Sequence, residues 1–182
     1  MMNFIIEKHL LLVANGDKNA LKNIYDILGQ QIYNLSLSIL KDHHLAEDNS
    51  QEVFLKLFNE TKTFKKGLNC KAWIMSITKN NAIDMLRKQK NIIYTDFMDK
   101  NGNDDSNLLK DNISNFEANT VSKLSLKDAM NFLDDCSREI VLLHLDVGLK
   151  FKEISEFLNS PLGTVTWKYS EALKKLKKLL NE

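Results

Sequence analysis

The C-terminal end of the chain carries two apolar-periodic stretches separated by its only proline. Residues 151–158 form the first stretch, and a longer one begins at Thr164 and ends in a run of lysines. Pro161 lies in the short segment between them and cannot continue a helix, while the preceding Asn-Ser supplies turn chemistry. Two helices joined by about four residues cross steeply, as in a helix-turn-helix. The pattern therefore predicts an all-α unit whose second helix can lie in the major groove of DNA.

The second of these helices has an apolar face and a basic face. Its apolar residues recur at steps of three and four, at Val165, Tyr169, Ala172, Leu173, Leu176 and Leu180. Between Lys168 and Lys178 there are five lysines and one glutamate, a local charge of +4. Lysines near phosphates release condensed counterions, so such a face gains affinity for DNA. The alternative is a solvated helix end whose cations suit the helix dipole.

Composition also indicates a helical protein, with one large or two small domains. The chain has 182 residues, 43% of them hydrophobic, with six glycines and one proline, which argues against a turn-rich all-β architecture. No apolar run is long enough to span a bilayer. The apolar N-terminal patch contains Glu7, Lys8 and His9, so it is interpreted as an amphipathic helix rather than a signal peptide. We therefore expect a cytoplasmic protein without membrane insertion.

The sequence lacks the patterns of an enzyme or a metalloprotein. Cys70 and Cys136 lie far apart, without metal-type spacing, and are expected to be idle thiols in a reducing compartment. The four histidines form no ligand pattern, and there is no glycine-rich phosphate loop or nucleophile motif. We predict no catalytic residues, no metal site, no cofactor and no small-molecule substrate.

The N-terminal part of the chain is helical by its apolar periodicity. The pattern predicts helices over 17–28 with Asp17 as N-cap, over 32–40, over 43–59 and over 70–89. The polar residues 60–69, with Gly67 among them, are expected to form a loop. Basic residues outnumber acidic ones by 13 to 9 between Met1 and Thr95, a charge of +4.

The middle of the chain changes character and divides it into two predicted domains. Residues 91–113 are rich in Asn, Asp and Ser, and residues 96–118 hold two basic against six acidic residues, which indicates a flexible acidic linker. Beyond it, Ser114 and Glu117 match a capping box, and a helix over 138–147 is expected to end at Gly148. We predict domains at 1–92 and 114–182, joined by a linker at 93–113.

Three motifs in order resemble those of the sigma-70 family of bacterial sigma factors, in its short two-domain extracytoplasmic-function group. Residues 46–58 read AEDNSQEVFLKLF, which is similar to the family's AEDLVQEVFLKLW helix. Residues 71–88 contain KAWI, KN and DMLRK, similar to RAWL, RN and DLLRR. Residues 133–176 resemble the C-terminal domain through EI, PLGTV and KKL. The resemblance covers nearly the whole chain and implies two small helical domains on a flexible linker.

The resemblance implies an alternative sigma factor that binds core RNA polymerase, directs it to promoter DNA and catalyses nothing itself. It also implies that an anti-sigma protein can sequester the factor. In the family the helix that corresponds to 43–59 docks on the coiled-coil clamp helices of the polymerase. The residues expected to do so are Asp48, Gln51, Glu52 and Lys56. Acidic residues early in a helix also favour its dipole, which is the alternative explanation of Asp48 and Glu52.

The resemblance implies that the two ends of a promoter are read by different domains. The −10 element would be read by the loop at 61–69 and the helix after it, with an unstacked base of the non-template strand captured there. The residues expected to bind are Lys65, Lys66, Asn69, Lys71, Asn80, Arg87 and Lys88. Trp73 is a potential stacking platform, but its spacing with Ile74 and Ile77 favours a place in the core.

The −35 element would be read by the helix that begins at Thr164. Residues expected near base edges or phosphates are Thr164, Thr166, Trp167, Lys168, Lys174 and Lys175. The chain departs from the family pattern at several points, because Trp167 replaces a small residue, Glu171 and Leu173 replace basic ones, and Asn49-Ser50 replace an apolar pair. These departures keep two alternatives open, a stand-alone helix-turn-helix regulator and a degenerate sigma-like protein that only binds proteins.

Overall fold

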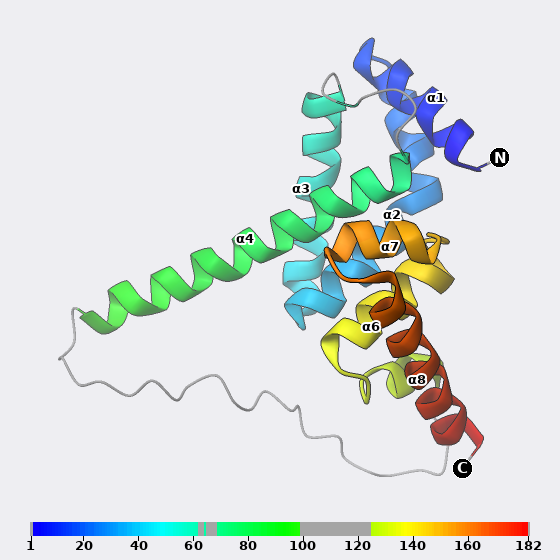
Figure 1. The fold of residues 1–182 in the computed structure, drawn as a ribbon. Helices are drawn as coiled ribbons and strands as arrows, with labels where there is room; N and C mark the ends of the chain where they lie inside the picture. The colour runs from blue at the N-terminus through cyan, green and yellow to red at the C-terminus, as the bar shows by residue number, and fades with distance from the viewer. Residues whose placement is uncertain (1, 62–63, 65–68, 99–124, 182) are drawn as a thin grey trace.

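The computed structural model describes residues 2–61, 64, 69–98 and 125–181, and this part of the chain is helical, without a β-strand. The N-terminal group of helices comprises α1 (Met2–Ala14), α2 (Lys18–Leu40), α3 (His43–Glu60) and α4 (Cys70–Met98). The C-terminal group comprises α5 (Leu126–Met130), α6 (Asp135–Val141), the π-helical turn η2 (Leu142–Asp146), α7 (Phe151–Leu158) and α8 (Leu162–Asn181). The all-α prediction is confirmed for the described residues, and Figure 1 shows how the two groups lie together.

Short polar caps begin α2 and α3 where the sequence predicts helix starts. The carboxylate of Asp17 accepts hydrogen bonds from the backbone N–H groups of Asn19 and Ala20, at 2.8 and 3.3 Å. The carboxylate of Asp42 accepts from the N–H of Leu45 at 2.9 Å. Each bond satisfies a donor that the first helical turn leaves without a partner, so both helix starts are set by local sequence.

The structure merges the two helices expected at 17–28 and 32–40 into the single helix α2. Residues 29–31, which the sequence prediction left unassigned, are helical as well, because a glycine inside a helix costs only about 1 kcal/mol relative to alanine. A Cβ built at Gly29 would lie 3.5 Å from the ring of Tyr25, so the ring covers the backbone at this point. Burial of α2 on both sides of the glycine outweighs the local cost.

The helix α4 is longer than expected and ends at Met98. It therefore includes the first part of the segment predicted as linker, and Figure 1 shows it projecting out of the helical bundle. The rest of that linker, and the capping box predicted at Ser114, lie outside the described residues. The division into domains at 1–92 and 114–182 stays a prediction.

A continuous apolar core joins the two groups of helices. Ile24, Leu28 and Ile32 of α2 belong to the same buried cluster as Ile140, Leu143 and Ile154 of the C-terminal group, and all six are nearly inaccessible to solvent. Helix α2 packs against α1, α3 and α4, and also against α6 and η2. The question of whether the two halves pack together, which the sequence leaves open, is answered by this shared core: in the structure they do.

Polar contacts surround this apolar contact between the halves. The bonds are Asn34 Nδ2 to Asp146 Oδ2 at 2.8 Å, Lys71 Nζ to the Val147 carbonyl at 2.6 Å, Lys79 to Glu139 at 2.9 Å and Lys41 to Asp135 at 2.8 Å. Burial lowers the pKa of Lys71, although the nearby carboxylates of Asp146 and Glu153 act in the opposite direction. The mostly exposed pair of Lys41 contributes little stability, whereas Lys71 and Lys79 are held at the edge of the core.

The predicted helix-turn-helix is confirmed as α7 and α8. Asn159 adopts the left-handed conformation, with φ of 49°, and ends α7. The carbonyl of Pro161 then accepts from the N–H groups of Thr164 and Val165, which closes the first turn of α8. Lysine at the N-cap position of α7 is compensated by a residue inside the helix, because the N–H of Lys150 donates to the carboxylate of Glu153 at 2.7 Å.

Two further expectations concern the membrane and the thiols. No helix among the described residues is both long enough and apolar enough to cross a membrane. Cys70 is buried and Cys136 half-buried, and neither of the two forms a disulfide. Burial raises the pKa of the Cys70 thiol to about 11, so the thiolate is scarce at neutral pH.

Replacement of Gly148 by alanine should destabilise the protein by about 1–2 kcal/mol, because Gly148 has a φ of 79° that L-residues adopt at a cost. The new Cβ would also lie 3.6 Å from Lys71 Nζ, in contact with the ammonium that joins the two halves. Gly163→Ala is the matched control, since nothing lies within 4 Å of its Cβ position. Urea denaturation should show the loss in Gly148→Ala alone; equal effects of both would contradict the strain argument.

Candidate functional site

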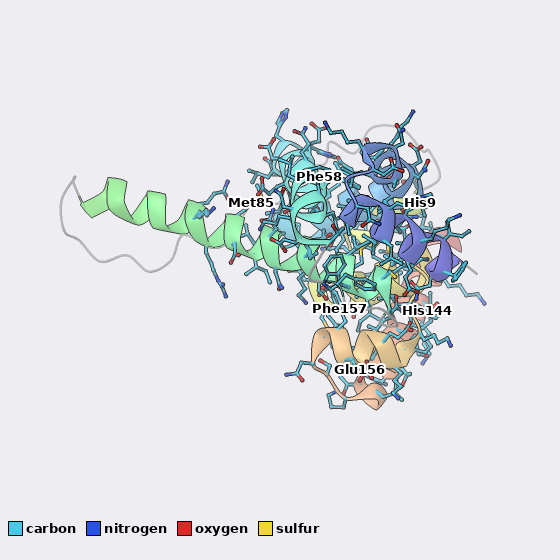
Figure 2. All side chains as sticks on the ribbon, turned by 90° about the horizontal axis from the view of Figure 1, so that it is seen from above. His9, Phe58, Met85, His144, Glu156 and Phe157 are labelled. Atoms are coloured by element: carbon cyan, nitrogen blue, oxygen red, sulfur yellow. The ribbon has the colours of Figure 1, made fainter. Side chains whose placement is uncertain are left out.

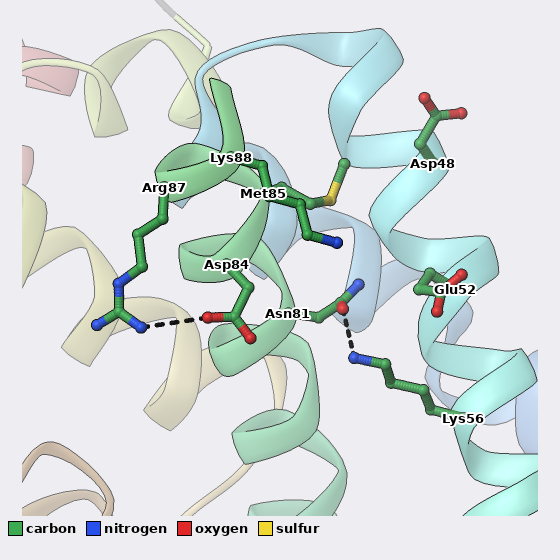
Figure 3. Close-up of a pocket in the computed structure, with 8 residues that line it drawn as sticks. All are labelled: Asp48, Glu52, Lys56, Asn81, Asp84, Met85, Arg87 and Lys88. Carbon is green, nitrogen blue, oxygen red and sulfur yellow. Dashed lines mark hydrogen bonds and ion pairs between the residues drawn. The ribbon is translucent and has the colours of Figure 1, made fainter. Parts of the chain in front are cut away.

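The outer face of α3 displays the polar residues that the sequence predicts there. Asp48, Gln51 and Glu52 are all exposed, at spacings that put them on one side of the helix. Among the described residues, no hydrogen bond or ion pair engages either carboxylate. Figure 3 shows Asp48 and Glu52 on successive turns of α3. The outer face of α3, defined by these three residues, is therefore a surface with negative charge available to a partner.

Lys56 differs from the other three residues predicted on this helix. Its side chain is half-buried, and its ammonium donates to Asn81 Oδ1 of α4 at 2.6 Å. Figure 3 shows it pointing across the pocket between α3 and α4, away from Asp48. This pocket has a volume of about 480 Å³ and is lined by Asp48, Glu52, Lys56, Asn81, Asp84, Met85, Arg87 and Lys88. Lys56 thus lies at the edge of the outer face of α3, toward α4.

A buried polar network, which the sequence analysis did not anticipate, pins α2, α3 and α4 together. Asn49 Nδ2 donates to Ser36 Oγ at 2.6 Å and to the Thr78 carbonyl at 3.3 Å, and Asn49 Oδ1 accepts from Asn81 Nδ2 at 2.8 Å. Asn49 is fully buried and Asn81 nearly so. Every bond is directional, so the network fixes the register of α3 against α4 in a way that apolar contacts do not.

The signal for this network is present in the sequence. Asn49 stands at an inward position of α3, where the resemblance leads one to expect an apolar residue. A polar residue at a core position requires a buried partner. The sequence does not say which residue that is, because Ser36 and Asn81 lie on other helices.

The residues predicted to read the −10 element are divided between two locations. Asn80, Arg87 and Lys88 are exposed on α4, and the guanidinium of Arg87 pairs with Asp84 at 3.2 Å. Lys71, at the other end of the helix, is occupied by the Val147 carbonyl of the C-terminal half. The structure thus leaves the middle of α4 accessible and engages its first turn.

The remaining residues of this group lie at the start of α4 and in the segment of sequence before it. Asn69 caps the helix, since its Oδ1 accepts from the N–H groups of Lys71 and Ala72 at 3.0 and 3.2 Å. Lys65 and Lys66 lie outside the described residues. Trp73 is half-buried and packs on Phe64 with ring centroids 5.1 Å apart, in agreement with its predicted place in the core.

The start of α8 presents an exposed aromatic side chain and an exposed threonine. Trp167 is 62% exposed, and Thr164 is also exposed. The hydroxyl of Thr166 is engaged by its own helix, because it donates to the carbonyls of Leu162 and Gly163, each at 3.1 Å. Thr164 and Trp167 are therefore better placed than Thr166 to contact a ligand.

The lysines predicted to read the −35 element have partners within the molecule. Lys168 pairs with Asp134 at 3.4 Å, Lys174 pairs with Glu171 at 2.7 Å, and Lys175 donates to the carbonyl of Phe132. A hydrogen bond from Ser137, supported by Lys168, lowers the pKa of Asp134 to about 2, so its carboxylate is charged at neutral pH. These pairs are at the surface and cost little to break.

An aromatic cluster sets the angle of the helix-turn-helix, and the sequence analysis did not identify it. The ring of His144 stacks on Phe151 at 4.2 Å and meets Tyr169 edge-on at 4.9 Å, and Phe151 and Tyr169 lie 5.0 Å apart. His144 Nδ1 also hydrogen-bonds to the Leu149 carbonyl at 2.8 Å. Figure 2 shows His144 beside α7. The cluster ties η2, α7 and α8 together and so holds α8 in position.

Comparisons with known proteins identify the class to which this fold and these surfaces belong. Residues 24–92 match the model of sigma-70 region 2, which covers α3 and most of α2 and α4. The chain is 30% identical over 192 residues to the ECF RNA polymerase sigma factor SigW of Bacillus subtilis, with 100% of both chains covered. It is 28% identical over 169 residues to SigX of the same organism, with 87% of this chain and 84% of SigX covered.

The fold is also found in solved structures. The sigma factor RpoE of Bartonella quintana, in complex with the anti-sigma factor NepR, superposes with a TM-score of 0.63 at 21% identity, covering 88% of this chain and 96% of RpoE. CnrH, in complex with the cytosolic domain of CnrY, gives a TM-score of 0.62 at 17% identity, covering 97% of each. The chain belongs to the ECF family of RNA polymerase sigma factors. It is an alternative sigma factor that directs transcription initiation, which is a regulatory role.

Asn49→Leu should destabilise the protein by about 1–3 kcal/mol, because it leaves the buried amide of Asn81 without its acceptor. Adding Asn81→Leu should recover most of this loss, since an apolar pair then replaces a polar one and Lys56 is half-exposed and can be hydrated. The free energies of unfolding of the single and double variants, in a double-mutant cycle, measure the coupling. Asn23→Leu, on the exposed side of α2, controls for the substitution itself. Additive losses would contradict the network.

Proposed function

We propose that this sigma factor docks on core RNA polymerase through the outer face of α3. Asp48, Gln51 and Glu52 are exposed together and have no partner in the described part of the chain, so binding a basic surface requires no internal bond to break. Lys56 contributes from the edge of this face, next to Asn81. The resemblance implies polymerase binding by this helix and the family membership supports the proposal, but the observation that carries it is the two carboxylates without a partner.

The promoter is proposed to be read from two separate surfaces. Asn80, Arg87 and Lys88 of α4 would bind the melted −10 strand, together with Lys65 and Lys66 from the sequence before α4. Trp167 and Thr164 would reach base edges of the −35 element, while Lys168, Lys174 and Lys175 would hold phosphates. The exposure of the α4 residues and of Thr164 and Trp167 supports this assignment. The ion pairs of Lys168 and Lys174 are weak surface pairs, so both lysines can exchange them for phosphates when DNA binds.

From the contacts of Lys71 we infer that the protein without polymerase adopts a closed form, in which the two groups of helices are in contact. Its ammonium would have to leave the Val147 carbonyl before it could meet the −10 strand. Separation of the halves on polymerase would release it. We further propose an anti-sigma protein as partner, which would act by keeping the halves together; the complex of the structurally similar RpoE with NepR motivates this.

Run-off transcription with purified core polymerase tests the docking surface. The double variant Asp48→Asn, Glu52→Gln should lose core binding and initiation together, because both carboxylates of the outer face become neutral. Asp26→Asn on α2, equally exposed, should behave as the parent protein. Full initiation by the double variant would contradict docking through the outer face of α3. A protein that binds duplex DNA tightly and needs no polymerase would instead be a stand-alone regulator.

Lys168→Ala should weaken promoter binding by the holoenzyme and reduce the slope of log K against log salt by about one. Asp134→Asn should have the opposite effect on affinity, because asparagine keeps the N-cap of α6 while the charge that competes for Lys168 disappears. Gel shifts over a series of salt concentrations measure both, with Lys22→Ala on α2 as control. An unchanged slope in Lys168→Ala would rule out its phosphate contact.

A further inference from the structure

A large apolar side chain adjoins the outer face of α3 on the side toward the C-terminus of the helix. Leu55 is 60% exposed although it belongs to a helix whose opposite side is fully buried. It follows Gln51 and Glu52 at steps of four and three residues and Asp48 at a step of seven, which places it on the same side of the helix, one turn further toward the C-terminus. Phe58, one turn further on, is 38% exposed and extends the apolar area. The inward side of the same helix consists of Ala46, Asn49, Val53 and Leu57.

A single exposed leucine is common on protein surfaces and needs no explanation by itself. The arrangement around Leu55 is what distinguishes it. Polar side chains flank it, with Gln51 and Glu52 one turn before it and the exposed Asn59 one turn after it. The carboxylate of Glu52, like that of Asp48 one turn further back, has no hydrogen bond or ion pair among the described residues. Binding surfaces have this composition, with an apolar anchor at the centre that fills a pocket and a polar rim that excludes water.

Charge indicates the kind of partner. From His43 to Glu60 the helix holds four acidic residues and one basic residue, a net charge of −3. The one cation, Lys56, is turned toward Asn81 and the pocket beside α4, so it does not neutralise the carboxylates of the face. The partner must therefore offer basic side chains around an apolar depression.

We propose that Leu55, with Phe58 at its side, is the apolar anchor by which α3 docks on core RNA polymerase. This rests on the proposed docking role of the outer face of α3 and adds to it the residues that supply most of the affinity. The carboxylates beside the anchor steer the approach and select a basic partner, because rim charges act mainly on the association rate. Burial of the leucine in a pocket of the polymerase surface supplies the affinity and slows dissociation.

The test compares Leu55→Ala with Leu145→Ala in the full-length protein. Leu145 is the matched control because it is 57% exposed and belongs to η2, in the other half of the molecule. Binding of each labelled variant to core polymerase is measured at low and high salt, with thermal unfolding as a check on the fold. Leu55→Ala should bind roughly 30-fold more weakly or worse, with an unchanged salt slope, while Leu145→Ala binds as the parent does.

A second variant, Leu55→Gln, keeps the length of the side chain and the helix propensity but removes the apolar anchor. It should lose core affinity to a similar extent while its melting temperature stays at that of the parent. One outcome is that both Leu55 variants bind core within threefold of the parent while the double variant Asp48→Asn, Glu52→Gln loses binding. The proposed docking face is then supported and the proposed anchor is wrong. If the carboxylate variant also binds normally, the proposed docking face itself is wrong. Equal losses in the Leu55 and Leu145 variants would also overturn the anchor.

Discussion

Helix α2 is buried on several sides at once, and the positions of the other helices depend on this. Its buried residues run from Ala20 to Leu40, and Ile24, Leu28, Ile32 and Leu35 are almost completely inaccessible to solvent. Full burial of each such side chain contributes about 1.5–3 kcal/mol. Because α1, α3 and α4 pack on one part of α2 while α6 and η2 pack on another, the same apolar surface holds the N-terminal group together and attaches the C-terminal group to it.

The bonds between and within the two halves differ in how readily a ligand can replace them. Lys168 and Lys174 pair with carboxylates at the surface, where salt and water already weaken the interaction. Lys71 is partly desolvated, and its carbonyl partner, Val147, is followed by Gly148, where an added Cβ would lie 3.6 Å from the ammonium. Release of Lys71 therefore requires the apolar contact between the halves to open, whereas the lysines of α8 can exchange their partners for phosphates without any change of fold. The proposed −35 surface is ready in the closed form, and the proposed −10 surface is only partly so.

The sequence predicted the helices and the helix-turn-helix because their signals are local. Asp17, Pro161 and Gly148 act within a few residues of their own positions, and the structure agrees with each. Prediction from the sequence was incomplete where contacts between several helices determine the structure. Gly29 does not break α2 because burial on either side is stronger than the local preference. Phe58 lies at the border of the apolar stripe that holds Val53 and Phe54, and packing with the other helices leaves it 38% exposed. The partners of Asn49 and Lys71 come from distant parts of the chain, so no pattern near either residue could identify them.

The buried amides connect these observations to the proposed mechanism. An apolar contact between α3 and α4 would tolerate small shifts of one helix along the other, since leucine and isoleucine contacts have little directional preference. Asn49 bonds to α2 on one side and α4 on the other, and Asn81 continues the chain of bonds to Lys56 at the surface. The outer face of α3 and the exposed side chains of α4 are consequently held at a fixed offset. A polymerase that binds the first surface would thereby place the second at a defined position on the promoter. The polar network is worth little as a source of stability, and its contribution is this fixed geometry between two binding surfaces.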